Sequence, residues 1–489
     1  MSRFARTRGP FAAAELEGRY RLAGTVTKRV LKDLEIAGRV LEGEFRPGKT
    51  GKEWIDANVL RTLRQRSLAK LRHQIEPVDH SAFGRFLPVW HRIGVERESP
   101  EAILEVIAQI QGYPIPASVL EDQVMRARVH DYDPHDLDAL MASGLVVWAG
   151  VDALGTTDGR IALYLTESAA TLLPDRLPPP VDDVHQRIRD YLASAGASFF
   201  PQIVQGIGGG FRAEALNALW DLVWSGEVTN DTLSPLRAFL ERKTTDRRRT
   251  TEHARNSGRS APVPESVGRW SLLSKMFAAP PPAVRMAAVS RQLLDRLGVV
   301  TRESVTAERF AGGFSALYPV FKAMEESGKI RRGYFIAGRG AAQFADPGAI
   351  ERLRAFRSAP DDPSIVMLAA TDPANPYGAA LPWPSRKDNR QAGRVAGAQV
   401  ILVDGELAAY FSKTEKSLLT FFDADDPRAD RFAEGVVRAL AGLVTSGLRR
   451  AVLITEVDGT NPARSVLSTA LENAGFRAGL QGWQRRASD

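Results

Sequence analysis

The stretch that decides the fold is LEIAGRVLEG at residues 34–43, and its pattern recurs three times along the chain. The other copies are LMASGLVVWAG at 140–150, LVWSGEVTN at 222–230 and MEESGKIRRG at 324–333. In each copy an apolar residue precedes a glycine by four positions, and a β-branched residue follows that glycine by two. Glycine suits the left-handed position that ends a helix, and β-branched residues favour the strand that follows. The pattern therefore predicts four helix–glycine–strand junctions.

One or two further helical patterns precede each junction, such as residues 12–20 before residues 26–36. The order helix, turn, helix, glycine stop and β-hairpin is that of a winged helix-turn-helix domain. Any α/β protein contains some helix–glycine–strand junctions, and residues 443–447 and 471–475 look like ordinary ones. Four copies after helical pairs favour an array of winged helices. Their uneven spacing indicates a string of domains and not a tight solenoid.

Outside the junctions, the composition and the hydropathy pattern of the sequence indicate seven segments and a helix-rich α+β fold. Residues 241–268 are poor in apolar side chains and rich in Arg, Ser, Thr and Pro, as a linker would be. Asp404-Gly405 between two apolar runs is a two-residue hairpin signal. The segments are winged helices at 1–56, 95–176, 177–240 and 269–346, basic connecting helices at 57–94, a basic flexible linker at 241–268, and an α+β domain at 347–489 built around a small antiparallel sheet or β-barrel.

Composition narrows the function classes. The 489 residues include 65 Lys plus Arg against 58 Asp plus Glu, a net charge of +7 that permits a nucleic-acid partner without requiring one. The absence of cysteine excludes disulfides, thiolate catalysis and iron–sulfur clusters. No apolar run approaches the roughly 20 residues needed to cross a bilayer, and no signal segment opens the chain. We expect a cytoplasmic, nucleoid-associated protein without a membrane partner.

Two motifs resemble a nucleotide site and a metal site, but the residues around them favour other interpretations. Residues 43–50, GEFRPGKT, satisfy the Walker A spacing, but a phosphate loop needs a helix starting at its lysine, and Gly51 interrupts one. A wing is the better interpretation. Residues 130–136, HDYDPHD, carry metal-capable side chains, yet Asp133-Pro134 is a favourable N-cap and N1 pair for the following helix. We predict neither a metal nor a cofactor.

The basic side chains give a more specific signal because they gather on the elements that read DNA in a winged helix. The second helix of the motif enters the major groove and the wing lies against the backbone, so cations there can neutralise phosphates. Exposed Lys and Arg are common on any surface, and each one singly is as consistent with solvation as with contact. The candidate phosphate contacts are Lys28, Arg29 and Lys32 on the first reading helix, Arg46 and Lys49 on its wing, Arg64 and Arg72 on the basic helix, and Arg331, Arg332 and Arg339 in the fourth module.

The sequence resembles the C-terminal region of the large helicase-related (Lhr) bacterial helicases over nearly its whole length. The matching segments are ARTRGPF at 5–11, the run from VLEGEF to LAKLR at 40–72, GRFLPVWH at 84–91, GYFIAGRG to IERLR at 333–354, and LAATDPANPYGAALPWP at 368–384. The resemblance implies tandem winged helices with a β-barrel-containing domain, DNA as partner, homo-oligomers, and helicase motor domains in the full-length family. The two motor lobes are absent from this chain.

That region is also similar to winged-helix DNA glycosylases of the AlkZ/YcaQ type, which carry a Gln-hydrophobic-Gln catalytic motif. Gln109 and Gln111, in IAQIQGYPIP, match its two glutamine positions. Cleaving an N-glycosidic bond develops positive charge on the sugar, and two amides could orient the attacking water. Glutamines at a helix end more often only hydrogen-bond to backbone or water. Asp372 is our further candidate, as a carboxylate facing the DNA groove.

These observations lead to a DNA-binding and DNA-repair module of an Lhr-type helicase without its ATPase motor, with DNA glycosylase activity implied by resemblance. The competing hypothesis is a non-enzymatic module that positions the motor and drives oligomerisation. A standalone winged-helix transcription regulator is a third reading, which the extended family match disfavours.

Overall fold

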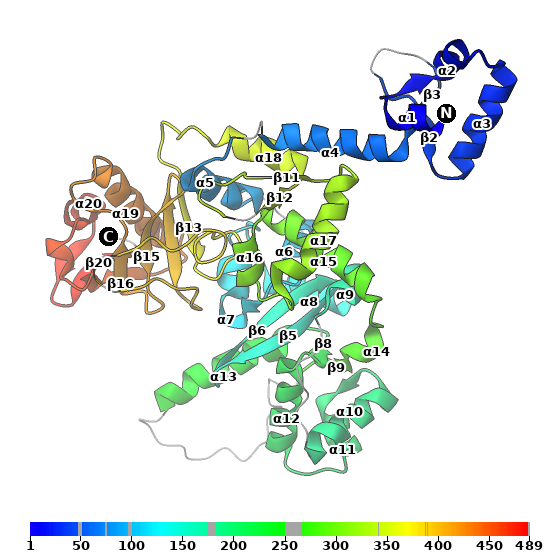
Figure 1. The fold of residues 1–489 in the computed structure, drawn as a ribbon. Coiled ribbons are helices and arrows are strands. Elements are labelled where there is room, and N and C mark those ends of the chain that lie inside the picture. The colour runs from blue at the N-terminus through cyan, green and yellow to red at the C-terminus, as the bar shows by residue number, and fades with distance from the viewer. Residues whose placement is uncertain are drawn as a thin grey trace. The chain divides into compact units, whose positions relative to one another are not determined.

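The computed structural model of the chain separates into two compact units (Figure 1). The first unit comprises Met1–Glu76 and Lys322–Tyr334, and the second comprises Pro77–Phe321 and Phe335–Asp489. The structure describes residues 1–46, 51–73, 76–95, 100–174, 182–249, 267–340, 342–386, 388 and 390–487. Within these residues, no helix is both long and apolar enough to pass through a lipid bilayer.

Four times in the described part of the chain, the element order is helix, strand, helix, helix, strand, strand. The first copy is α1 (Ser2–Arg6), β1 (Phe11–Ala12), α2 (Ala13–Tyr20), α3 (Gly24–Ile36), β2 (Val40–Gly43) and β3 (Glu53–Asp56). The second is α6 (Pro100–Ile110), β4 (Ile115–Pro116), α7 (Ala117–Val119) with the π-helix η1 (Leu120–Met125), α8 (Pro134–Ala142), β5 (Val146–Leu154) and β6 (Asp158–Leu165). This order confirms the winged-helix prediction.

The third copy is α10 (Asp183–Ala195), β7 (Ser198–Phe199), α11 (Phe200–Gly206), α12 (Arg212–Trp224), β8 (Val228–Asn230) and β9 (Arg269–Leu272). The fourth is α15 (Pro282–Leu297), β10 (Val299–Val300), α16 (Arg302–Ala307), α17 (Gly313–Glu326), β11 (Arg331–Gly333) and β12 (Gln343–Ala345). In the first three copies the last strand lies between the other two, in the orders β1-β3-β2, β4-β6-β5 and β7-β9-β8. Strand β10 likewise pairs antiparallel with β12.

The hydrogen bonds at the four junctions explain the spacing in the sequence. Gly38, Gly144, Gly226 and Gly328 all have positive φ, between 65° and 79°. After each glycine, the next N–H donates to the carbonyl of the apolar residue four positions before it, at 2.9–3.0 Å. This six-to-one bond closes the helix, and the chain then leaves in the direction of the next strand. The predicted junctions are confirmed.

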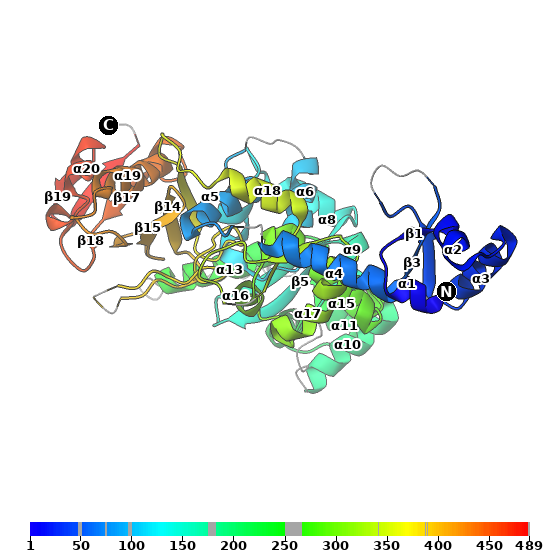
Figure 2. The ribbon, with the colours of Figure 1, turned by 45° about the horizontal axis from the view of Figure 1, so that its top comes forward.

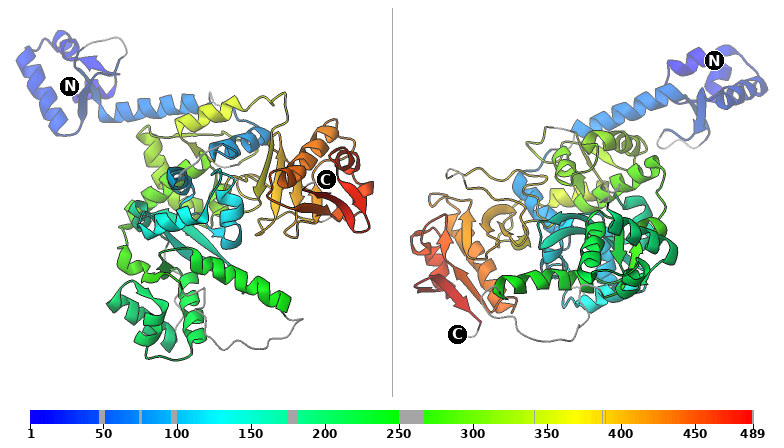
Figure 3. Two further views of the ribbon diagram at one scale, coloured as in Figure 1. Left: turned by 180° about the vertical axis from the view of Figure 1, so that it is seen from behind. Right: turned by 90° about the horizontal axis from the view of Figure 1, so that it is seen from below.

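Two boundaries differ from the sequence expectation. Helix α13 (Ser234–Arg249) continues through residues 241–249, which we predicted to be linker; Figure 3 shows it as one continuous green helix. Arg, Lys and Glu in that stretch are good helix formers, so a charged composition alone does not identify a linker. Residues 250–266 lie outside the described residues. Strand β9 then pairs with β7 and β8, so residues 269–272 complete the third sheet although we assigned them to the fourth module.

The C-terminal domain is an α+β structure with two sheets. Strands β13 (Ile365–Ala369), β14 (Gln399–Val403), β15 (Glu406–Phe411), β16 (Ser417–Thr420) and β18 (Glu456–Val457) form one sheet in that order, and β17 (Ala451–Ile454), β20 (Gly482–Arg486) and β19 (Arg477–Gly479) form the other. Helix α19 (Ala429–Thr445) packs on them (Figure 2), followed by η3 (Pro462–Arg464) and α20 (Ser468–Asn473). Among the described residues no pairing joins the edge strands β13 and β18, so closure into a barrel stays a prediction.

The backbone of helix α5 (His80–Trp90) packs directly against the backbone of the β14–β15 hairpin. Asp404 and Gly405 both have positive φ, 54° and 81°, which confirms the predicted two-residue turn. A Cβ atom on Gly84 of α5 would lie 1.9 Å from the Gly405 carbonyl oxygen. Beside this contact the buried Arg85 donates to the Asp404 carbonyl at 2.6 Å. The remaining helices are α4 (Ala57–His73), α9 (Thr166–Leu172), α14 (Leu273–Met276) and α18 (Pro347–Ala355).

This close approach makes Gly84→Ala a sharp test of the packing. Backbone cannot yield as a flexible side chain can, so we expect the free energy of unfolding to fall by about 1–3 kcal/mol. Denaturant unfolding of the purified chain measures it. The matched control is Gly442→Ala in α19, where a Cβ meets nothing within 4 Å and the helix should gain about 0.5–1 kcal/mol. Equal stability of the two variants would contradict the contact.

Candidate nucleic-acid interface

The reading helix of the first winged helix, α3, presents three cations to solvent. Thr27 and Leu31, one turn apart, are buried and fix which face of α3 packs on the domain. The side chains of Lys28, Arg29 and Lys32 occupy other positions and are exposed. In Figure 1, α3 lies beside the β2–β3 hairpin. The structure therefore places three of the predicted phosphate contacts together on the element that enters the major groove in this fold.

The wing of the same domain is braced by its own ion pairs. The Arg46 guanidinium pairs with Glu53 and lies 3.4 Å from Glu15, so it holds the base of the hairpin together. Glu53 is buried and also accepts from the N–H groups of Phe45 and Arg46 at 3.1 and 3.0 Å. An arginine committed to a buried acid is less available to DNA than an unpartnered one. Lys49 lies outside the described residues.

The Walker-like stretch lies in this hairpin. Gly43 ends β2, which pairs antiparallel with β3, and none of the described residues between Gly43 and Ala57 starts a helix. A phosphate loop requires a helix N-terminus at that point. This pairing supports the interpretation of residues 43–46 as part of a wing. Residues 47–50 lie outside the described residues, so for them the interpretation stays a prediction.

The remaining predicted phosphate contacts have mixed surroundings. Arg64 on α4 is exposed, whereas the side chain of Arg72 lies outside the described residues. Arg331 is half-buried, and Arg332 places its Nε 3.5 Å from the carboxylate of the buried Glu325. Arg339 is half-buried, with a long 3.5 Å contact to the Ala380 carbonyl. Arg64 therefore resembles the α3 cations in exposure, and the three fourth-module arginines do not.

The corresponding helix of the third winged helix is used for packing. Eight of the thirteen residues of α12 are buried, and Trp220 stacks on Trp224 with ring centroids 5.5 Å apart. Gly150 of β5 approaches so closely that a Cβ there would lie 2.0 Å from the Val223 carbonyl oxygen. The wing of the second domain therefore packs against α12 near its C-terminal end, while Ala213, Glu214, Asn217 and Asp221 on another face are exposed. Two of these four exposed residues are acids and none is a cation, so this face is poorly suited to phosphate contact.

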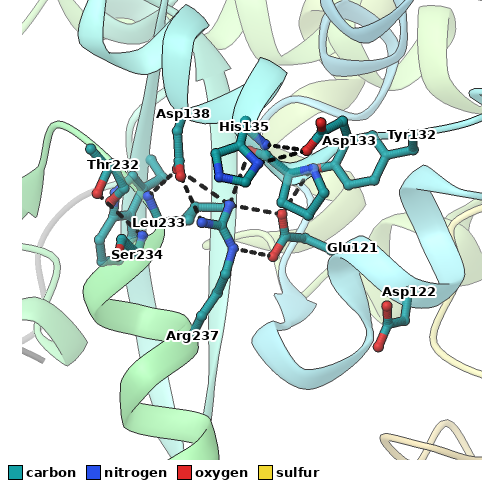
Figure 4. A network of polar contacts seen from close by, with 12 residues as sticks. Glu121, Asp122, Tyr132, Asp133, His135, Asp138, Thr232, Leu233, Ser234 and Arg237 are labelled. Carbon is teal, nitrogen blue, oxygen red and sulfur yellow. Dashed lines mark hydrogen bonds and ion pairs between the residues drawn. The ribbon is translucent and has the colours of Figure 1, made fainter. Parts of the chain in front are cut away.

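The reading helix of the second winged helix is acidic and engaged by α13 (Figure 4). Arg237 of α13 donates to Asp138 at 2.6 Å and to Glu121 at 2.7 and 3.0 Å. Tyr132 donates to the same Glu121 at 2.8 Å, and burial together with that carboxylate raises the pKa of Tyr132. Asp133 accepts from the His135 N–H at 2.9 Å, which confirms it as the N-cap of α8. The second and third domains thus form a scaffold joined by a charged network.

The two glutamines of the glycosylase-like motif have different environments. Gln111 is buried; its amide donates to Gln292 at 2.9 Å and accepts from the Leu165 N–H at 3.3 Å. Gln109 is half-buried and donates to the Trp90 carbonyl at 2.9 Å. Among the described residues its amide oxygen has no hydrogen-bond partner. Gln292 of α15 also donates to the carbonyls of Ala108 and Gln109, so it holds this segment from a second domain.

Asp372 does not face a groove as predicted. Its exposure is 0%, and its carboxylate forms a two-point pair with Arg128 at 2.7 and 2.8 Å. It also accepts from the Ala374 N–H at 2.7 Å. Although burial would raise the pKa of Asp372, Arg128 outweighs it and holds that pKa below the ordinary value. The carboxylate therefore joins the second winged helix to the C-terminal domain.

Arg128 and His91 complete this buried network, and sequence analysis missed both. Arg128 is 1% exposed and donates to His91 Nδ1 at 3.3 Å as well as to Asp372. Burial and the charge of Arg128 lower the pKa of His91 to about 3. The pairing joins residues 244 positions apart, and no spacing in the sequence announces it.

Comparison with known proteins shows what the chain is similar to. Residues 78–166 and 279–365 match models of winged-helix domains of the large helicase-related protein. The Lhr helicase/probable uracil glycosylase of Mycolicibacterium smegmatis is 39% identical over 99% of this chain and 33% of its own length. The Lhr helicase/uracil glycosylase of Escherichia coli is 32% identical over 98% of this chain and 33% of its own length.

The chain thus spans about a third of the length of these Lhr relatives. Among solved structures, the Streptomyces sahachiroi DNA glycosylase AlkZ aligns with 78% of this chain and 99% of its own, with a TM-score of 0.45 and 15% identity. The family resemblance inferred from the sequence is confirmed by the Lhr winged-helix matches.

Proposed function

We propose that the chain is a DNA-binding, DNA-repair module of a large helicase-related protein. The observation that carries the proposal is the exposed group Lys28, Arg29 and Lys32 on α3. A winged helix reads DNA with this helix, and phosphate neutralisation supplies most of the affinity. The first domain is the gripping element, with Arg64 on α4 as a further phosphate contact. The second and third domains act as scaffold, because α8 is acidic and bound by Arg237 and most residues of α12 are buried.

A salt titration tests the grip. We expect the variant Lys28→Ala, Arg29→Ala, Lys32→Ala to bind duplex DNA roughly 10²- to 10³-fold more weakly at about 0.1 M salt. The slope of log affinity against log salt should fall in magnitude by about 0.9 per lost contact, since fewer counterions are released. Fluorescence anisotropy measures both quantities. The control Arg302→Ala, Lys416→Ala, Arg438→Ala removes the same charge from exposed positions outside the first domain. Equal losses in the two variants would contradict a grip by α3.

We further infer that the chain hydrolyses the N-glycosidic bond of uracil or another damaged base. The names of both Lhr relatives, which include uracil glycosylase, support this. Gln109 is our candidate for orienting the attacking water, because it is half-buried and its amide oxygen has no partner within the described residues. The amide nitrogen of Gln111 donates to Gln292 and its amide oxygen accepts from Leu165, so Gln111 acts as a positioning residue for this segment. Asp372 has no access to a substrate in this structure and is proposed only as a structural anchor.

The experiment is incubation with duplexes carrying uracil, an alkylated purine or an interstrand crosslink, followed by alkaline cleavage of abasic sites. We expect product from the native chain and at least a 100-fold slower reaction from Gln109→Ala, by analogy with the loss of one oriented donor at an active site. Gln186→Ala, on an exposed helix position, is the control. If no lesion gives product while DNA binding is intact, the glycosylase hypothesis is contradicted and the non-enzymatic module is favoured.

The extensive burial of α12 supports a second role for the remaining domains. In this role they hold the first domain relative to the helicase motor of a full-length protein. Homo-oligomer formation, nucleoid association and barrel closure belong to the same proposal. Light scattering of the purified chain measures the oligomeric state, and a monomer at all accessible concentrations would remove oligomerisation from it.

A further inference from the structure

A cleft of about 520 Å³ opens in the first unit between α1 and the beginning of α4. Four of its lining residues, Val59, Thr62, Leu63 and Arg66, have the spacing i, i+3, i+4, i+7 and therefore share one face of α4. The complete lining is Arg6, Asp56, Asn58, Val59, Thr62, Leu63 and Arg66. A volume of this size falls within the range of small-molecule sites.

The charge of the cleft favours an anion. Arg6 comes from α1 and Arg66 from α4, and both side chains are exposed. Asp56 is the one acid among these seven described residues, and it is 4% exposed. Its carboxylate accepts from the N–H groups of Asn58 and Val59 at 2.9 and 3.3 Å and so caps α4. The acid is thereby satisfied by the helix, and the two guanidinium groups set the electrostatics of the opening.

The rest of the lining suits a flat heterocycle. Val59 is half-buried and Leu63 is 41% exposed, so a partly uncovered apolar surface lies along the cleft. The Thr62 hydroxyl donates to the Asn58 carbonyl at 2.9 Å, which leaves its oxygen able to accept. The Asn58 side-chain oxygen accepts from Arg61 at 3.3 Å, which leaves its amino group to donate. A donor and an acceptor therefore stand beside an apolar floor and two cations.

We propose that this cleft binds one unstacked nucleotide of single-stranded DNA. Arg6 and Arg66 hold the phosphate, Val59 and Leu63 cover one face of the base, and Asn58 and Thr62 hydrogen-bond to its edge. The inference rests on the proposed DNA grip and adds a single-strand site to the same unit. An acidic peptide would also satisfy the two arginines, but it would leave the apolar floor and the paired donor and acceptor unused.

Anisotropy with three fluorescent probes tests the site: a blunt duplex, the same duplex with a thymidine overhang, and oligothymidylate. We expect Arg6→Ala, Arg66→Ala to bind oligothymidylate about tenfold more weakly, with a salt slope smaller in magnitude by about 1.4, and to bind the blunt duplex normally. Leu63→Ser should weaken oligothymidylate binding several-fold with an unchanged salt slope, because it removes base contact and no charge. The matched control is Arg3→Ala, Arg39→Ala, which removes two exposed arginines from the same unit but not from the cleft.

The outcomes separate the cleft from the α3 grip. Loss of overhang and oligothymidylate binding with a normal blunt duplex supports the cleft. Equal loss in the Arg3, Arg39 control overturns the proposal. Full displacement of oligothymidylate by a polyglutamate peptide at equal charge concentration also overturns it. Normal oligothymidylate binding by the cleft variant also overturns it, whether or not the α3 variant has lost the duplex. Circular dichroism melting of each variant keeps misfolding distinct from lost binding.

Discussion

Asp372→Asn should destabilise the chain by about 3–5 kcal/mol, although the substitution keeps the size and shape of the side chain. The carboxylate and the Arg128 guanidinium are 0% and 1% exposed, and two hydrogen bonds of 2.7 and 2.8 Å join them. Removing the negative charge leaves a buried cation without compensation, and the low dielectric around it gives water no means to replace the partner. Denaturant unfolding near neutral pH measures the loss.

The control for this prediction is an ion pair of similar length at the surface. Arg92 and Glu105 approach to 2.6 Å, but their side chains are 51% and 53% exposed. Arg92→Ala should cost about 1 kcal/mol or less, because solvent screens the pair. A double variant, Asp372→Leu with Arg128→Met, should recover much of the stability that Asp372→Asn loses, since no charge is then buried. Similar costs for Asp372→Asn and Arg92→Ala would contradict the buried pair.

The sequence allowed prediction of the features that depend on neighbours along the chain. The four glycine junctions, the Asp404-Gly405 turn and the Asp133 cap each involve a few consecutive residues, and their hydrogen bonds follow from backbone geometry. The burial of α12 was also readable in principle. Leu216, Leu219, Trp220, Val223 and Trp224 form one apolar stripe along that helix, and Ala215, Ala218 and Leu222 widen it, so most of the helix is expected to be buried.

Pairing between distant residues determines the surroundings of two predicted site residues. Glu53 pairs with Arg46 across the hairpin, and the phosphate contact of Arg46 stays a prediction. Arg128 pairs with Asp372 and buries the carboxylate that we predicted to face a groove. The sequence shows the charge of a residue, but it does not show which distant residue will pair with that charge. Arg128, His91 and Gln292 gave no local signal, because their partners are in other domains.

The buried imidazole of His91 should make the chain sensitive to acid well above the range in which carboxylates titrate. Arg128 donates to Nδ1 of His91, so that nitrogen must be unprotonated, and no partner within the described residues accepts from Nε2. Burial first, and then the charge of Arg128, lower the pKa of His91 to about 3. The charge of Arg296 acts in the same direction, whereas the charge of Asp372 and the backbone of Arg296 act in the opposite one. An unfolded histidine has a pKa of about 6.5.

The sign follows from proton uptake. Between about pH 6.5 and pH 3 the unfolded chain binds a proton at residue 91 that the folded chain excludes, so the free energy of unfolding decreases as pH falls. The expected slope is about 1.4 kcal/mol per pH unit for this one group. Asp372 has a lowered pKa, and its contribution is lost only at pH values below its ordinary range. The interval from pH 6.5 to about 4.5 therefore isolates the histidine from that carboxylate.

Urea unfolding of His91→Gln at several pH values in this interval provides the measurement. The variant should show a pH slope smaller than that of the native chain by about 1.4 kcal/mol per unit, whatever its stability at neutral pH. His130→Gln, at a side chain that is 51% exposed, should keep the native slope. The comparison of slopes separates titration from packing, because a lost contact shifts stability by the same amount at every pH. An unchanged slope in His91→Gln would mean that the imidazole becomes solvated before the chain unfolds, and the network would then be a loose contact between domains and not a sealed one.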